Sequence, residues 1–169
     1  MSVFRVFQVI CAALVLSSSA AIAQGANVAF GGLKHDASLP VEITADELTV
    51  DQASGEAVFI GNVVAGQGDM RLSAGQVEVK YATADGQTTG RISQLIATQG
   101  VTLVNGAEAA EAQRAVYHVE RAEIVMTGDV ILTQGQNALS GEQLTVDLAS
   151  GNGRMTGRVK TIFRTDDGN

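Results

Sequence analysis

The chain has 169 residues, 46% of them hydrophobic and 4% aromatic, and 18 acidic against 11 basic residues give a net charge of −7 at pH 7. This length suits one domain, and the acidic balance argues against nucleic acid and anionic membrane surfaces as partners. The only cysteine is Cys11, which lies in an apolar leader, so the exported chain can form neither a disulfide nor a thiolate metal site.

Residues 1–23 have the layout of a secretory signal peptide. Arg5 gives a basic start, an apolar run covers residues 6–16, and residues 21–23 form an A-x-A cleavage site. The run is short for a membrane span, although a retained N-terminal anchor is the alternative. Cleavage after Ala23 removes Arg5 and makes the net charge −8. An exported, cysteine-free chain of this kind fits a bacterial periplasm.

The mature chain is predicted to contain one domain with short flanking segments. Residues 24–38, which include His35, are predicted to be a flexible lead-in. The domain is expected over residues 39–164, and residues 165–169 form a short C-terminal tail. Pro40 opens the first predicted strand, a position at which no hydrogen-bond donor of a sheet is lost.

An internal repeat is the strongest signal in the sequence. Residues 56–81 align without gaps with residues 123–148, and ten of the 26 pairs are identical. Each copy contains apolar runs interrupted by a glycine and a Gln-Gly turn. The glycines that interrupt these and the neighbouring runs are expected to be bends or bulges: Gly61, Gly100, Gly128 and Gly157. One such unit cannot bury its own apolar face, so the repeat predicts a stack of short strand pairs.

The local periodicity is that of strands. Val77 and Val79 alternate with Glu78 and Lys80, which is a period of two. Turn signals arrive every eight to twelve residues, which predicts an all-β sandwich, jelly roll or solenoid.

Two segments depart from this regular pattern. Residues 82–90 contain the hairpin signal Asp85-Gly86 and are predicted to be a longer loop. Residues 107–115 are rich in helix formers. They occupy a repeat position, so a strand is predicted there, with a short helix as the alternative.

The sequence offers no convincing catalytic constellation. His118 is predicted to be an exposed strand residue, and no histidine pair has metal-ligand spacing. The carboxylates Glu42, Asp51, Glu78 and Asp147 fall on outward positions or at strand ends. The chain is therefore predicted not to be an enzyme and to need no cofactor or metal. A glycan-active or glycan-binding β-solenoid is an alternative that would require two convergent carboxylates.

Several short motifs, in order, resemble the OstA-like family. They are the Pro-x-x-Ile-x-Ala-Asp start at residues 40–46, the F-x-G-N-V step at 59–63, the M-T-G-D-V step at 126–130, the Gln-Gly turns that follow these steps, and A-x-x-V-x-V strands such as 74–79. The resemblance covers about residues 39–160. It implies a twisted, half-open antiparallel β-jelly roll.

The resemblance also implies a function and partners. It implies a periplasmic bridge that binds lipopolysaccharide acyl chains in a hydrophobic groove. Such a protein receives the lipid from an inner-membrane complex that contains an LptC-like protein and passes it to an outer-membrane LptD-like translocon. Family members join these partners, and each other head to tail, through edge strands. The alternative is an OstA-like envelope scaffold with a filled core and no lipid binding.

The groove would be aliphatic, and each buried methylene would contribute roughly 0.8 kcal/mol. By resemblance it lies near Val41 and Ile43, along the strand of Val101 and Leu103, and near Tyr117 and Val119. The full set of candidate lipid-binding residues comprises apolar strand positions: Val41, Ile43, Leu48, Val50, Val58, Ile60, Val63, Leu72, Val77, Val79, Val101, Leu103, Tyr117, Val119, Val130, Leu132, Leu144 and Val146. For any single residue the alternative is an ordinary place in the core. The basic C-terminal tail of the family is absent here.

Overall fold

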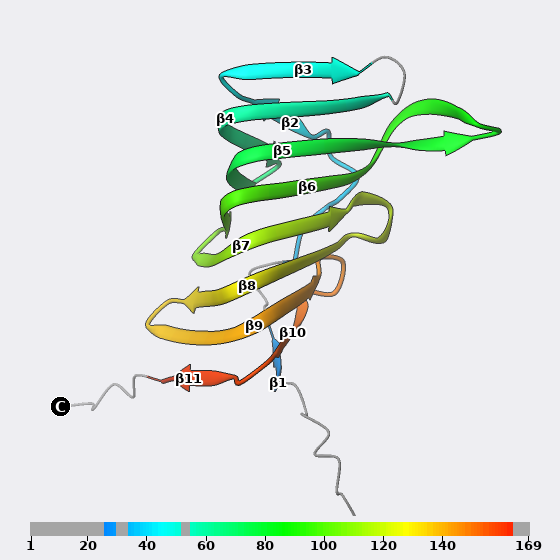
Figure 1. The fold of residues 1–169 in the computed structure, drawn as a ribbon. Coiled ribbons are helices and arrows are strands. Elements are labelled where there is room, and N and C mark those ends of the chain that lie inside the picture. The colour runs from blue at the N-terminus through cyan, green and yellow to red at the C-terminus, as the bar shows by residue number, and fades with distance from the viewer. Residues whose placement is uncertain (1–25, 30–33, 52–54, 164–169) are drawn as a thin grey trace, which may run out of the picture.

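A computed structural model describes residues 26–29, 34–51 and 55–163 (Figure 1). The predicted signal peptide and C-terminal tail lie outside these residues. The elements in chain order are β1 (Ala26–Ala29), β2 (Glu42–Thr44), β3 (Glu47–Asp51), β4 (Glu56–Gln67), β5 (Met70–Ala84), β6 (Gln87–Asn105), β7 (Glu108–His118), the 3₁₀ turn η2 (Val119–Arg121), β8 (Glu123–Gln134), β9 (Asn137–Asp147), β10 (Asn152–Thr156) and β11 (Lys160–Ile162).

All strands of the described residues belong to one antiparallel sheet. The strand order is β1-β10-β9-β8-β7-β6-β5-β4-β2, with β3 also paired to β4 and β11 also paired to β9. Figure 1 shows these strands stacked above one another, with β3 at one end and β10, β11 and β1 at the other. The predicted all-β, half-open jelly-roll architecture is confirmed.

Strands β4 to β9 each bend near the middle, where the pairing skips residues. The first skip lies between Ile60 and Val63 in β4. Gly61 and Asn62 occupy it with φ values of +77° and +45°. Glycine and asparagine tolerate this left-handed conformation, whereas most side chains resist it. The predicted bend at Gly61 is thereby confirmed.

The other three predicted bends have the same character. Gly128 and Asp129 repeat the pattern with φ values of +86° and +48°, where β8 skips register against its neighbours. Gly100 in β6 and Gly157 after β10 also have positive φ values. Polar side chains join adjacent bends: the Asn62 amide donates to Asp46 and the Gln113 amide to Asp129, both at 2.8 Å. The bends thus form a column down one side of the molecule.

The column of bends divides the sheet into two halves. We call the part that ends in β3 and β10 the first half-sheet, and the part that ends in β2 and β11 the second half-sheet. Their inner faces enclose one aliphatic core, in which Leu95 and Met126 of the first half-sheet and Leu72 and Leu132 of the second are buried. Because side chains alternate along each strand, every second residue points into this core.

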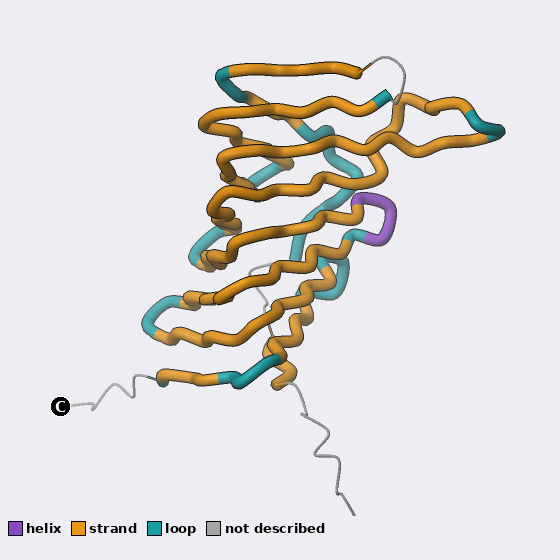
Figure 2. The backbone as a smooth tube through the Cα atoms, viewed as in Figure 1, coloured by secondary structure: helices purple, strands orange, loops and turns teal. Residues whose placement is uncertain are grey.

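Residues 82–90 are not the predicted loop. β5 continues to Ala84 and β6 starts at Gln87, so only Asp85 and Gly86 form the turn. Both have positive φ, as a two-residue hairpin requires. The ribbon projects beyond the sheet, as Figure 2 shows. Residues 108–115 lie in β7, which confirms the predicted strand over most of 107–115.

The predicted flexible lead-in is structured wherever it is described. β1 pairs antiparallel with β10 at the far end of the first half-sheet. Residues 34–41, which we call the strap, then run behind the strands toward β2 (Figures 1 and 2). The His35 N–H donates to the Leu148 carbonyl oxygen at 2.8 Å. Apolar alternation is weak in this stretch, and for that reason these contacts could not be predicted from the sequence.

Candidate functional site: the interior and its openings

The structure brings most of the predicted lipid-binding residues to one inner surface. The members that are buried in the core are Val63, Leu72, Val77, Val79, Val101, Leu103, Tyr117, Val130, Leu132, Leu144 and Val146. Val41, Ile43 and Val119 are half-buried against them. Leu48 and Val50 pair with Phe59 and Ala57, which places them on the same inner side. The interior is thus a continuous aliphatic surface that runs through the stack.

Val58 and Ile60 are the exceptions. They alternate with Ala57 and Phe59 and so lie on the outer face, where Val58 pairs with Glu78. The prediction that these two residues line the interior is therefore wrong. The run AVFI at residues 57–60 is apolar throughout. It therefore has no polar–apolar alternation from which the inward and outward side chains could be predicted.

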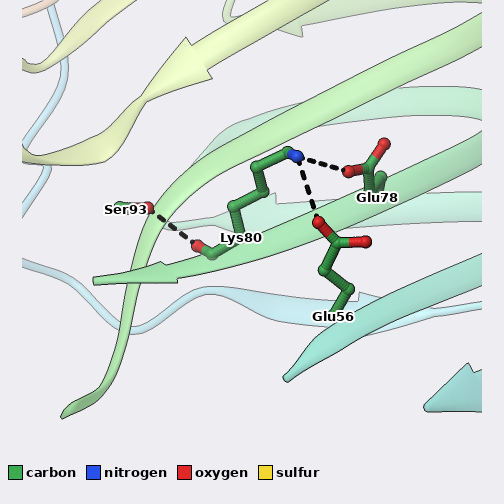
Figure 3. A network of polar contacts seen from close by, with 4 residues as sticks. All are labelled: Glu56, Glu78, Lys80 and Ser93. Carbon is green, nitrogen blue, oxygen red and sulfur yellow. Dashed lines mark hydrogen bonds and ion pairs between the residues drawn. The ribbon is translucent and has the colours of Figure 1, made fainter. Parts of the chain in front are cut away.

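Charged side chains mark the outer face beside Val58. Lys80 Nζ lies 2.9 Å from Glu78 Oε1 and 3.2 Å from Glu56 Oε1, and the Ser93 hydroxyl donates to the Lys80 carbonyl oxygen (Figure 3). The hydrogen bond from Lys80 to Glu78 is the main reason why the pKa of Lys80 is raised. Glu78 thus lies on the outside, where the sequence places it.

The middle of the interior is filled. Val77, Leu103, Val130 and Leu132 have no exposed surface, and the same holds for Leu144. The space left behind the strap is about 10 Å³, at the lower limit of what one water molecule needs. In this conformation these side chains pack against one another in the middle of the stack.

The inner surface opens to solvent at the β2–β3 end. Leu48 and Val50 on β3 are 52% and 58% exposed. Ile43 on β2 and Phe59 on β4 are half-buried behind this end. Among the described residues no strand continues either half-sheet beyond β2 and β3. An apolar surface at a sheet end with free backbone groups can accept either an apolar ligand or another strand.

A second opening lies between the half-sheets, on the side of the strap. We call it the mouth; its lining includes Val41, Gln67, Met70, Tyr117 and Ile124. The Tyr117 hydroxyl of the first half-sheet donates to Gln67 Oε1 of the second at 2.9 Å. The Gln67 amide nitrogen donates to two strap carbonyl oxygens, those of Ala37 at 2.9 Å and Leu39 at 2.7 Å. Gln67 therefore ties both half-sheets to the strap.

The stretch of sequence around Gln67 does not by itself predict these contacts, although the repeat contains a signal for them. Gln67 and Gln134 are the equivalent glutamines of the two Gln-Gly turns, Gln67-Gly68 and Gln134-Gly135. Gln134 also makes an amide contact, at 2.8 Å to Glu108 Oε1. A glutamine that precedes a turn and recurs at the same place in an apolar repeat indicates a polar contact at the rim of the core.

The dependence of stability on pH tests how Tyr117 is packed at the mouth. Burial raises its pKa above 10.0, while the bond with Gln67 acts in the opposite direction. The folded state holds the proton more tightly than the unfolded state, so this contribution to stability is complete below pH 10 and is lost as the pH rises through the raised pKa. Chemical denaturation between pH 8 and 11 should therefore show a steeper alkaline loss of stability for the native chain than for Tyr117→Phe.

His118 and Asp147 lie apart from the interior and have local partners. His118 lies on the outer face, where Gln94 approaches its Nδ1 at 2.9 Å, and burial is the main cause of its lowered pKa. Asp147 accepts the N–H groups of Ala149 and Ser150, both at 2.9 Å, and so stabilises the turn after β9. Over 26–29, 34–51 and 55–163, no three side chains of the His, Cys, Asp and Glu types gather as a metal site would require.

Comparison with known proteins identifies the family. Residues 42–152 match the model of the family described as LptA/(LptD N-terminal domain) LPS transport protein. The chain belongs to this family. It is also 31% identical over 152 residues to an uncharacterised protein of Rhizobium meliloti strain 1021, covering 86% of this chain and 82% of that protein.

A solved structure supports the same fold. The crystal structure of LptH from Pseudomonas aeruginosa, described as the LptA-homologous periplasmic component of the lipopolysaccharide transport device, superposes with a TM-score of 0.67. The match covers 77% of this chain and 99% of LptH at 18% identity. This LptA-family chain therefore has the fold of a lipopolysaccharide transport component. No helix in the described part of the chain is both long and apolar enough to cross a bilayer.

Proposed function

We propose that this protein carries lipopolysaccharide across the periplasm by binding its acyl chains on the inner apolar face. In this role it accepts the lipid from an inner-membrane export complex with an LptC-like member and passes it to an outer-membrane LptD-like translocon. The observation that carries the proposal is the apolar inner surface exposed at Leu48 and Val50, at the end of a jelly roll of this family.

Acyl burial, and not charge, supplies the attraction. The chain has a net charge of −7, and lipopolysaccharide is also anionic. Arg114 and Arg154 lie exposed on different strands of the outer face, whereas Arg71 lies beside the strap residues Leu39 and Pro40, so these arginines do not gather at one opening. An acyl chain that buries ten methylenes gains roughly 8 kcal/mol, which is enough to hold it without a specific polar contact.

Edge strands are the surfaces that support contact with partners. β2 and β3 at one end and β11 at the other have no further neighbour among the described residues. Such edges pair with strands of another chain through main-chain hydrogen bonds. We propose that the LptC-like and LptD-like partners, and further copies of this chain, join head to tail at these ends.

A photo-crosslinking residue tests the lipid path directly. Placed at position 59 on the inner face or at position 43 behind the open end, it should form a lipopolysaccharide adduct in the exported protein that detergent competes away. Position 58 is the matched control, because it lies next to 59 in the same strand but on the outer face. Adducts at all three positions, or at none, in a folded protein would contradict the proposal.

The filled interior supports a second candidate, an envelope scaffold that binds no lipid. Leu103 and Leu132 have no exposed surface, as expected of a core that only holds the strands together. A fluorescent acyl-chain probe separates the two functions. Uptake that lipopolysaccharide competes away supports transport, whereas a folded protein that takes up no probe supports the scaffold.

A further inference from the structure

Beyond β10, the first half-sheet is extended by β1, a strand from the opposite end of the sequence. β1 pairs antiparallel with β10, with Ala26 opposite Met155 and Ala29 opposite Asn152. Without β1, β10 would be the edge of this half-sheet, because β9 is its only other partner in the described part of the chain. The second half-sheet ends in β11, which has no further partner among the described residues. The N-terminal segment therefore covers one of the two edges at this end.

The direction of β1 matches that of a strand from a neighbouring molecule. From β3 to β10 the first half-sheet passes through seven antiparallel steps, by way of β4, β5, β6, β7, β8 and β9. β3 therefore runs opposite to β10. In a head-to-tail stack with a continuous sheet, β3 of the next copy meets β10 antiparallel, as β1 does now. β1 therefore has the position and direction that the incoming strand would take.

β3 is suited to take the place of β1 on this edge. Its five residues, Glu47–Asp51, are all exposed, and β10 also has five residues, Asn152–Thr156, with which they can form main-chain hydrogen bonds. β3 of another copy can therefore replace β1 without a break in the sheet.

The same N-terminal segment also covers the mouth. The strap is held there by the His35 N–H to Leu148 and by the Gln67 amide to Ala37 and Leu39. Val41 at its end packs against the core and lines the small space inside the mouth. An acyl chain cannot pass between the half-sheets here while the strap is in place.

The two contacts are close together along the chain. From residue 29, at the end of β1, to residue 34, at the start of the strap, there are five Cα–Cα steps, which span at most about 18 Å. Each part, while bound, therefore holds the other at a high effective concentration near its own contacts, and release of one part removes that advantage from the other. Displacement at the β10 edge and displacement at the mouth are favoured together.

We infer that residues 26–29 and 34–41 act as a self-supplied plug that couples lipid entry to assembly. β1 occupies the edge at which the next copy of this chain docks, and the strap closes the mouth through which lipid reaches the interior. Binding of either the lipid or the next copy displaces the plug and so favours the other, because such coupling is reciprocal. This inference rests on the proposed lipid-transport function.

A disulfide lock tests the plug. Asn27 and Arg154 are direct cross-strand partners, and the mature chain contains no other cysteine, so Asn27→Cys with Arg154→Cys fixes β1 on β10. The matched control is Thr145→Cys with Arg154→Cys, which joins β9 to β10 and leaves β1 unbound. Self-association is measured by sedimentation velocity, and lipid uptake with fluorescently labelled lipopolysaccharide.

The oxidised lock should lower both self-association and lipopolysaccharide uptake at least tenfold, with recovery on reduction by dithiothreitol. The control disulfide should change neither. An opening variant tests the opposite direction: Asn27→Pro with Val28→Pro removes two adjacent N–H groups, one of which faces β10 in an antiparallel pair. This variant should self-associate several-fold more strongly than the native chain.

The possible results distinguish a failure of the plug from a failure of the proposed lipid transport. If the locked protein takes up lipid and assembles as the control does, the plug is contradicted. Adducts at positions 43 and 59 would still support lipid transport in that case. If the lock blocks assembly alone, the coupling is overturned. If the native chain forms no adduct and takes up no lipid, the proposed function fails and the inference fails with it.

Discussion

Replacing Gly128 with alanine is expected to lower the free energy of unfolding by roughly 2–5 kcal/mol. Gly128 has a φ of +86°, which strains any side chain, and a Cβ at this position would lie 2.9 Å from the Cβ of Gln113 on β7. Left-handed strain contributes about 1–2 kcal/mol, and the overlap between packed strands adds about 1–3 kcal/mol. In a chain of this size the melting temperature should fall by roughly 5–15 °C.

Gly100→Ala is the matched control for this loss. Gly100 lies in the same column of bends with a φ of +79°, but a Cβ there meets nothing within 4 Å. Its substitution should therefore carry the strain alone, about 1–2 kcal/mol. Urea denaturation of both variants measures the difference. Equal losses of unfolding free energy for the two variants would show that the contact with Gln113 does not add to the cost of a side chain at position 128.

Leu48→Asp is expected to weaken lipopolysaccharide binding at least tenfold while leaving the fold intact. Leu48 is 52% exposed at the open end of the inner surface, so the core loses little when it is replaced. A bound acyl chain would cover this side chain, and full burial of a leucine is worth about 1.5–3 kcal/mol. An aspartate at this position would also lose its hydration when the lipid covers it, which costs free energy and weakens binding further.

Thr49→Asp separates this effect from charge. Thr49 is the next residue along β3, it pairs with Val58, and it therefore faces outward. The variant adds the same negative charge to the same strand and should bind lipopolysaccharide as the native chain does. Equal losses for Leu48→Asp and Thr49→Asp would mean that charge repulsion, and not acyl contact, sets the affinity. The melting temperatures of both should stay within a few degrees of the native value.

The bends could be predicted from the sequence because their chemistry is local. A glycine followed by asparagine or aspartate inside an apolar run indicates a left-handed bend in a strand, and Gly61 and Gly128 recur at equivalent positions of a repeat. The alternation of Val77 and Val79 with charged residues likewise predicts which side chains of this strand point inward and which point outward. These signals depend only on neighbouring residues, and they determine most of the strand stack.

The use of the interior could not be predicted in the same way. Val, Leu and Ile side chains look alike in a packed core and in a groove, so the sequence does not separate buried Leu132 from exposed Leu48. The difference arises from position in the stack, since Leu48 lies on a terminal strand. The pairing of β1 with β10 and the Gln67 contacts join residues far apart in the chain, and no local pattern reports them.

The column of bends also determines how the interior can widen. Six strands cross from one half-sheet to the other at this column, and side-chain contacts such as Asn62 with Asp46 reinforce it. On the opposite side, the half-sheets meet through the Tyr117–Gln67 contact. Any widening is therefore a rotation about the column, like that of a hinge, with little displacement beside the bends and the largest displacement at the mouth. A change in the angle between the two half-sheets would then make room for ligands of different width, while the strand pairing within each half-sheet stays intact.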